Sequence, residues 1–294
     1  MAQRWHRPVM VAEVLEWLAV RPDGHYLDAT IGSGGHAEAL LARLTTGRLI
    51  GVDRDPMALE IAQERLRPYA AKLTLVEDTF ARLAEIHERL GLGSLDGLVA
   101  DLGVSSLQLD APERGFSFQR AGPLDMRMNP NDTLTAAELV NHFPEGELAA
   151  IIRRYGEERS ARKIARAIVR ARPVRDTLHL AQVVAGTQHK GRQKLHPATR
   201  TFLALRIAVN RELEELEQFL RRVPVTLKSG GRVVVLAYHS LEDRLVKQAF
   251  RAAAAAGTLR LLTRKPLAPS PHEVRANPRA RSAKLRAAEK LPEN

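Results

Sequence analysis

Three aspartates stand where short apolar segments end in the first third of the chain: Asp28, Asp53 and Asp101. The loop Gly32-Ser33-Gly34-Gly35 lies between the first two. Glycines let the backbone turn tightly and approach a ligand closely, and an acid at the end of the following strand can accept both hydroxyls of a ribose. This spacing predicts a binding site for a cofactor that contains a nucleoside.

Two cofactors fit this loop. Gly32-x-Gly34-x-x-Ala37 satisfies the dinucleotide fingerprint, with Asp53 about twenty residues further on, so NAD is one candidate. Asp28 favours the other, because its carboxylate repels a pyrophosphate but attracts the cationic α-amino group of S-adenosylmethionine. A third interpretation is that Asp28 only caps the next turn through its side chain. We therefore expect the methyl donor, with NAD and a plain turn as alternatives.

Asp101 is the first candidate for chemistry on a second substrate. It ends a strand at the edge where open α/β sheets place ligands, so it could contact the cofactor or accept a proton from a substrate nitrogen. The alternative is that Asp101 caps a following helix. His239 follows a later predicted strand, 232–237, and is a second candidate, for which a helix cap at Ser240 is the structural alternative.

The elements that position these residues alternate between helix and strand from residue 9 to 101, which predicts a parallel sheet with helices on both faces. Strands are expected at 26–28, 48–53, 73–77, 95–101 and 232–237. The basic tail around 277–286 could form a final strand that closes the sheet. The fold class is therefore α/β, with a Rossmann-like sheet.

About 130 residues separate the strands at 95–101 and 232–237, whereas a crossover connection needs only about a dozen. The segment between them is mostly helical, so we expect an inserted small helical domain at 108–196 and a discontinuous sheet domain made of 1–107 and 197–294. A single long amphipathic helix, 198–222, is expected to return the chain to the sheet.

Positive charge is concentrated in two segments. The chain carries a net charge of +11, and residues 151–200 hold thirteen Lys or Arg against three acids, while residues 251–294 hold ten against three. Such surfaces suit phosphate backbones. Arg162, Arg166 and Arg170 lie on one helix face, which is either a solvated face or an RNA contact. The expected RNA-binding residues are Arg162, Arg166, Arg170, Lys190, Arg192 and Lys194. An aromatic content of 4% favours structured RNA over an extended stacking platform.

The composition also argues against several kinds of site. There is no cysteine, which excludes disulfides, thiolate zinc sites and cysteine nucleophiles. The histidines lack metal-ligand spacing, so no metal is expected. No apolar run approaches the length of a bilayer span, and the N-terminus lacks the apolar core of a signal peptide, so we expect a cytoplasmic protein with no membrane contact.

Several long motifs occur in one order along nearly the whole chain. They are His6-Arg7-Pro8-Val9-Met10, Asp28-Ala29-Thr30-Ile31-Gly32-Ser33-Gly34-Gly35-His36, Gly51-Val52-Asp53-Arg54-Asp55-Pro56, Asp101-Leu102-Gly103-Val104-Ser105-Ser106, Gln108-Leu109-Asp110, Arg114-Gly115-Phe116-Ser117-Phe118, Gly122-Pro123-Leu124-Asp125-Met126-Arg127-Met128, Tyr238-His239-Ser240-Leu241-Glu242-Asp243-Arg244 and Asn277-Pro278-Arg279-Ala280-Arg281-Ser282-Ala283-Lys284-Leu285-Arg286. With these motifs the chain resembles the bacterial 16S rRNA cytosine-N4 methyltransferases of the MraW or RsmH type.

The resemblance implies a methyltransferase that modifies a cytidine in the decoding centre of the small ribosomal subunit, at the P site. The sequence is compatible with a monomer or a homodimer. The resemblance also implies contacts to S-adenosylmethionine from Gly34, Gly35, His36, Asp53, Phe80, Asp101 and Gln108. Phe80 would pack on the adenine, and the segment 115–127 is a candidate lid. For the acceptor of the amino proton, the candidates in order are Asp101, then His239 or Ser105.

One departure concerns the base. Many amino-methyltransferases place Pro-Pro-aromatic after the acid, whereas this chain has Leu102-Gly103-Val104. Candidates for stacking on a flipped cytosine are therefore Phe116, Phe118 and Tyr238. Two other classes of function remain as alternatives: a nicotinamide-dependent oxidoreductase, and a non-catalytic RNA-binding factor for ribosome assembly.

Overall fold

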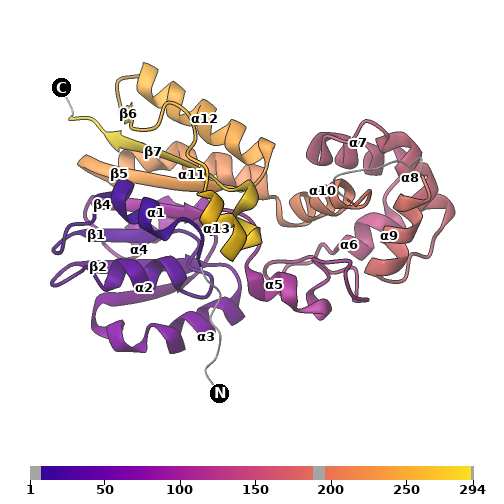
Figure 1. Ribbon diagram of the computed structural model, residues 1–294, viewed down its shortest axis with the longest axis horizontal. Coiled ribbons are helices and arrows are strands. Elements are labelled where there is room, and N and C mark those ends of the chain that lie inside the picture. Colours follow the sequence, from indigo (N-terminus) through magenta and orange to yellow (C-terminus); the bar gives the residue numbers. More distant parts are fainter. Residues whose placement is uncertain (1–7, 188–195, 293–294) are drawn as a thin grey trace. The chain divides into compact units, whose positions relative to one another are not determined.

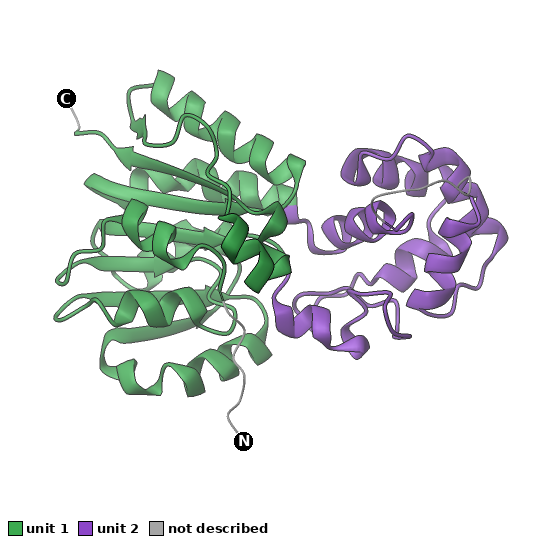
Figure 2. Cartoon of the chain, viewed as in Figure 1, with its two compact units in different colours: residues 1–103, 213–294 green, residues 104–212 purple. Residues whose placement is uncertain are grey.

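The computed structural model describes residues 8–187 and 196–292, which form two compact units. Unit 1 consists of Met1–Gly103 and Leu213–Asn294, and unit 2 of Val104–Glu212 (Figure 2). The helical unit thus begins slightly before the insertion expected at 108–196 and extends beyond its end. Each unit has a hydrophobic core of its own and is described separately.

Unit 1 is built on a seven-stranded sheet with the order β3-β2-β1-β4-β5-β7-β6 (Figure 1). The strands are β1 His25–Asp28, β2 Arg48–Asp53, β3 Leu73–Glu77, β4 Leu95–Asp101, β5 Leu227–Ala237, β6 Leu259–Leu261 and β7 Lys284–Lys290. Strands β1 to β5 are parallel, and β7 runs antiparallel to β5 and β6. The α/β fold and the strand formed by the basic tail are both confirmed.

Helices cover both faces of this sheet because successive strand residues point to opposite sides. Along β5, Val233 and Val235 belong to one core cluster, while Val234 and Leu236 belong to the other. The first face is covered by α4 Leu83–Arg89, α11 Glu212–Thr226 and α12 Ser240–Ala255, and the second by α1 Val11–Leu18, α2 Gly35–Leu41 and α3 Pro56–Arg65. Shorter elements complete the unit: η1 Arg67–Lys72, η2 Phe80–Arg82, α13 Pro271–Ala276 and η4 Pro278–Ser282. This is a doubly wound arrangement.

Unit 2 is helical and packs around a separate core. Its elements are α5 Ser106–Asp110, η3 Pro112–Arg114, α6 Ala136–His142, α7 Glu145–Gly156, α8 Ala161–Arg170, α9 Thr177–Ala185 and α10 Thr199–Asn210. On α8, Ile164 and Ile168 are fully buried, whereas the arginines of the opposite face are exposed, as the four-residue spacing predicts. Throughout the described parts of both units, no helix is long and apolar enough to cross a membrane.

The prediction of a single long helix at 198–222 is wrong. The structure has two helices, α10 and α11, because Arg211 adopts a left-handed conformation with φ +51° and ends α10. Phe202 of α10 lies in the core of unit 2, whereas Phe219 of α11 lies in the core of unit 1. The apolar period continues across the break and arginine is an ordinary helix former, so neither signal reveals the break. Helix α10 therefore belongs to the inserted unit.

Candidate active site at the carboxyl edge of the sheet

Asp28, Asp53 and Asp101 end β1, β2 and β4, three neighbouring parallel strands of unit 1. Their carboxyl ends therefore meet at one edge of the sheet. The chain runs outward from β1 through β2 to β3 and then continues on the other side of β1 with β4, so the strand order reverses between β1 and β4. Ligands of open α/β sheets bind outside the strand ends at such a switch point. Asp28 and Asp101 flank it, and the sequence predicts this place at the edge for Asp101.

The glycine loop between β1 and α2 has a backbone that favours glycine at two positions. Gly32 has φ +51° and Gly34 has φ +80°, both in the left-handed region. Gly35 opens α2, and a Cβ built there would lie 2.9 Å from the ring of Pro8. Larger residues would strain the loop or displace its neighbour. The loop can therefore present its backbone closely to a ligand, which is the role expected of Gly34 and Gly35.

Asp53 anchors this loop to the end of β2. Its Oδ2 accepts a hydrogen bond from the amide of Gly32 at 2.8 Å, and its Oδ1 accepts one from the amide of Asp55 at 3.0 Å. Burial raises the pKa of Asp53, and these amide hydrogen bonds act in the opposite direction. A carboxylate oxygen has a second lone pair, so the same oxygens can also accept from ribose hydroxyls. The ribose contact remains a prediction, whereas the structural link between Asp53 and Gly32 is present.

Asp101 is held by side chains on two sides. Its Oδ1 accepts a hydrogen bond from the phenol of Tyr238 at 2.6 Å, and its Oδ2 lies 3.6 Å from Nδ1 of His36. The other ring nitrogen of His36, Nε2, lies 2.8 Å from the carbonyl oxygen of Val9. A carbonyl oxygen only accepts, so Nε2 carries a proton, and Nδ1 can donate to Asp101 only when the ring is charged. Sequence reasoning assigned His36 to the donor site and missed its contact with Asp101.

Asp28 is a buried acid at the same edge. It is 2% exposed and accepts a hydrogen bond from the amide of Thr30 at 3.1 Å. Burial raises the pKa of Asp28 to about 7, while the charge of His36 lowers it and the carboxylates of Asp101 and Asp53 raise it. Burial raises the pKa of Asp101 as well. A cationic ligand would favour the ionised carboxyls, whereas a pyrophosphate would disfavour them. The edge thus fits the α-amino group of S-adenosylmethionine.

Phe80 is placed beside the carboxyl end of β3 by the short helix η2. Its ring contacts that of Phe219 edge to face, with 5.4 Å between the centroids and 74° between the planes. The hydroxyl of Thr79, the residue that caps η2, donates to Glu215 at 2.7 Å. These contacts fix a half-buried aromatic ring at the edge of the sheet, and its packing on an adenine remains a prediction.

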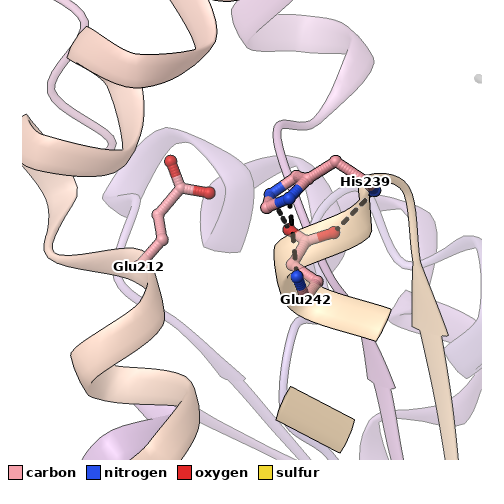
Figure 3. Close-up of side chains that lie close together, drawn as sticks. All are labelled: Glu212, His239 and Glu242. Carbon is pink, nitrogen blue, oxygen red and sulfur yellow. Dashed lines mark hydrogen bonds and ion pairs between the residues drawn. The ribbon is translucent and has the colours of Figure 1, made fainter. Parts of the chain in front are cut away.

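His239 is the N-cap of α12, a role that the sequence offered to Ser240. Its Nδ1 accepts a long hydrogen bond of 3.4 Å from the amide of Glu242, and its Nε2 lies 3.0 Å from Oε1 of the same residue (Figure 3). The other oxygen of Glu242 accepts from the amide of Tyr238 at 2.8 Å. The same oxygen accepts from the amide of His239 at 3.3 Å, which completes a capping box with histidine in the place of the usual serine or threonine. The glutamate three positions after the cap was the missed signal. The cap gives His239 a structural role, but its buried Nε2 makes no hydrogen bond with the described residues. Its proton-acceptor role remains a prediction.

Ser105 and Gln108 lie in unit 2 and satisfy each other. Ser105 caps α5: its hydroxyl accepts from the amide of Gln108 at 3.2 Å, and the Oε1 of Gln108 accepts from the amide of Ser105 at 3.0 Å. This reciprocal pair is a capping box. It gives both side chains a structural role within the unit, so a donor contact from Gln108 and proton transfer by Ser105 remain predictions.

The two phenylalanines considered for base stacking pack inside unit 2. Phe116 is 8% exposed in its core, and Phe118 contacts the rings of Phe202 and His196, each at 4.7 Å between centroids. In the candidate lid, Gly115 has φ +71°, and a Cβ there would lie 2.2 Å from the carbonyl oxygen of Pro123. The segment is thus folded tightly against itself.

The basic face of α8 is exposed as expected. Arg166 forms an ion pair with Glu145, with 3.4 Å between Nε and Oε1, so its charge is partly matched. No ion pair within the described residues engages Arg162 or Arg170. The other expected RNA contacts, Lys190, Arg192 and Lys194, lie outside the described residues.

Comparison with known proteins identifies the family. Residues 3–291 match the profile of the MraW methylase family. "Ribosomal RNA small subunit methyltransferase H" of Trichlorobacter lovleyi is 50% identical, over 99% of this chain and 100% of the relative. The protein of that name from Acidobacterium capsulatum is 51% identical, over 99% of this chain and 100% of the relative. That from Geobacter sulfurreducens is 50% identical, over 97% of this chain and 99% of the relative. These matches confirm the resemblance and decide between the two cofactors. The chain belongs to the MraW methylase family, and S-adenosylmethionine is its methyl donor.

Proposed function

We propose that the protein transfers the methyl group of S-adenosylmethionine to the N4 amino group of a cytidine in the P site of 16S rRNA. The observation that carries the proposal is the placement of Asp101 at the switch point, hydrogen-bonded to Tyr238 at 2.6 Å and close to the buried Asp28. The resemblance and the names of the relatives support the substrate. A ribosomal substrate would place the protein in the cytoplasm.

The donor would lie across the carboxyl edge of unit 1. Asp28 would attract its α-amino group, Asp53 would accept from the ribose, and Phe80 would pack on the adenine. The glycine loop would follow its backbone closely. Bound in this way, the donor supplies an electrophilic sulfonium methyl group.

The amino nitrogen of cytosine is a poor nucleophile because its lone pair is delocalised into the ring. Holding this nitrogen in line with the methyl group therefore supplies much of the rate. Asp101 would accept a hydrogen bond from the amino group, which localises the lone pair, and then take the proton that the nitrogen loses. The Tyr238 phenol holds the carboxylate of Asp101 through Oδ1. The other oxygen, Oδ2, lies near His36 and would be the one that accepts from the substrate.

The inserted unit would hold the rRNA. Its basic helix α8 exposes Arg162 and Arg170, and cations of this kind contact phosphates without reading sequence. The choice of the base would then depend on the edge of the sheet and on the fold of the RNA.

The test is to incubate the protein with labelled donor and small ribosomal subunits that lack the modification, and to analyse the nucleosides by mass. We expect N4-methylcytidine at one position, and none with Asp101→Ala. Subunits that bind but gain no label would leave only an assembly role. Label on another base or ring position would contradict the proposed specificity.

A further inference from the structure

We infer that the junction between α7 and α8 in unit 2 is a phosphate-binding hollow for the RNA backbone. The inference rests on the proposed function, since it names how the inserted unit holds its substrate. It concerns a different set of side chains from the stripe on α8: Arg153, Arg159, Ser160, Arg162 and Lys163 line a hollow of about 560 Å³.

Three short stretches of chain bring these residues together. Arg153 lies in the last turn of α7, Arg159 and Ser160 in the connecting turn, and Arg162 and Lys163 in the first turn of α8. The four cationic side chains are all exposed. Four positive charges therefore line one concavity, and none of the described residues that line it is acidic.

Among the residues that the structure describes, no side chain neutralises these charges. In the described part of the chain, no hydrogen bond or ion pair engages the side chains of Arg153, Arg159, Arg162 or Lys163. The buried acid of the connecting turn, Glu158, is already satisfied. Its Oε1 accepts from the amide of Ser160 at 2.8 Å, and its Oε2 lies 3.7 Å from Arg200.

Like charges gathered without counterions repel one another, so the folded arrangement favours an anion. Guanidinium groups bind phosphate oxygens in a bidentate manner. Ser160 adds a hydroxyl that does not cap its own helix through its side chain.

The chemistry of the lining selects a phosphate backbone over other ligands. The volume lies within the range of small-molecule pockets, about 300–1,000 Å³, but such pockets are mostly apolar and aromatic. None of the described residues that line this hollow is aromatic, so they offer a base no ring to stack on. Successive phosphates of rRNA match the charge of the lining, and contacts of this type position an RNA without reading its sequence.

The hollow also changes how much each arginine of α8 is expected to contribute to RNA binding. Arg162 belongs to both, whereas Arg166 is engaged by Glu145. We therefore expect the charges around the connecting turn to contribute more to RNA affinity than Arg166 does.

The test uses the full-length protein with the double variant Arg159→Ala/Lys163→Ala. The matched control is Arg43→Ala/Arg48→Ala, which removes two exposed charges near the start of β2, at the opposite edge of the sheet. Binding to small ribosomal subunits is titrated at several salt concentrations. Calorimetry with S-adenosylhomocysteine and circular dichroism check the donor site and the fold.

We expect the Arg159→Ala/Lys163→Ala variant to bind subunits about tenfold more weakly, with a salt slope shallower by about 2, since each lost phosphate contact removes about 1. Its KM for subunits should rise while kcat stays unchanged. The control should match the wild type. Equal affinity and slope in the two double variants would overturn the inference.

A free anion is the other possible occupant. Inorganic pyrophosphate is therefore titrated at constant ionic strength. If it binds the wild type but not the Arg159→Ala/Lys163→Ala variant, while subunit affinity is the same in both, the RNA assignment is wrong. The nucleoside analysis is separate: wild type that binds subunits through the hollow but forms no N4-methylcytidine contradicts the proposed reaction and leaves the hollow standing.

Discussion

The phenol of Tyr238, the residue after β5, donates a hydrogen bond of 2.6 Å to Asp101 at the end of the neighbouring strand β4, although the two residues are 137 positions apart in sequence. The bond favours the ionised carboxylate, whereas burial disfavours it. Tyr238 is therefore a positioning residue for the proposed proton acceptor.

Replacing Tyr238 by Phe removes this hydrogen bond and keeps the ring. A hydrogen bond to a charged group contributes about 1.5–3 kcal/mol, so kcat should fall roughly ten- to a hundredfold. The pKa of Asp101 should rise, which moves the acidic limb of the pH–rate profile to higher pH. Tyr69→Phe, in η1, is the control. An unshifted profile would show that Tyr238 does not act through Asp101.

Asp53→Ala should weaken the donor chiefly at its ribose. The change also releases the amides of Gly32 and Asp55, so we expect a loss of about ten- to a hundredfold in affinity for S-adenosylhomocysteine by calorimetry. Glu60→Gln, exposed on α3, should leave the affinity unchanged. Normal affinity in Asp53→Ala would move the ribose site elsewhere.

The buried Asp28 should make stability depend on pH. Its pKa is about 7 in the folded protein and 3.8 ordinarily, so the folded chain retains a proton that the unfolded chain has released. Protonation of Asp28 therefore contributes at most about 4 kcal/mol to the free energy of unfolding. This contribution is full below about pH 4 and is lost as the pH rises through 7. As the pH rises from 5 to 7, the free energy of unfolding should fall more in the wild type than in Asp28→Asn.

Urea unfolding followed by tryptophan fluorescence measures this difference, because Trp17 of α1 packs against the core of unit 1. Asp23→Asn, at an exposed acid, should keep the wild-type slope in this range. Parallel pH curves for wild type and Asp28→Asn would place the protonation elsewhere.

Gly34→Ala should damage the donor loop. The left-handed backbone costs an alanine about 1–2 kcal/mol, and its Cβ would lie 3.1 Å from Leu66. We expect a lower free energy of unfolding and weaker donor binding. Gly146→Ala, where a Cβ meets nothing within 4 Å, should be neutral or slightly stabilising. Equal effects of the two changes would contradict the strain argument.

Ser105 can be tested as a cap rather than a base. Ser105→Ala should cost about 1 kcal/mol of stability, whereas Ser105→Asn should restore the cap. Neither change should lower kcat if the residue only caps α5. A large loss of kcat in both variants, with normal stability in Ser105→Asn, would instead assign the proton acceptor to Ser105.

The carboxyl edge of the sheet could be predicted because its signals are local. Each strand carries its own acid at its end, and parallel strands bring these ends together without further information. The glycine loop is likewise local, since its positive φ values need glycine. Asp28, Asp53 and Asp101 therefore lie where the sequence places them.

Contacts between distant segments could not be predicted in this way. The register of β4 on β5 pairs Asp101 with Leu236 and so brings Tyr238 within reach of the carboxylate, and no spacing in the sequence encodes it. The pairing of Arg166 with Glu145 depends on how α7 and α8 pack. Similarly, the left-handed conformation of Arg211 could not be predicted, because arginine is not a residue type that favours it.

The insertion of unit 2 between β4 and β5 has a consequence for biosynthesis. The buried residues in the core of unit 2 all lie between 116 and 209, so this core is complete in sequence before the ribosome has made β5. The core of unit 1 contains residues from Leu27 to Ala288, so it is complete only after β7 has been made. Until β5 has been made, β4 has no partner on that side. Because domains fold as units during synthesis, the helical unit should fold first on the nascent chain, while the catalytic sheet waits for its last strands with one edge open.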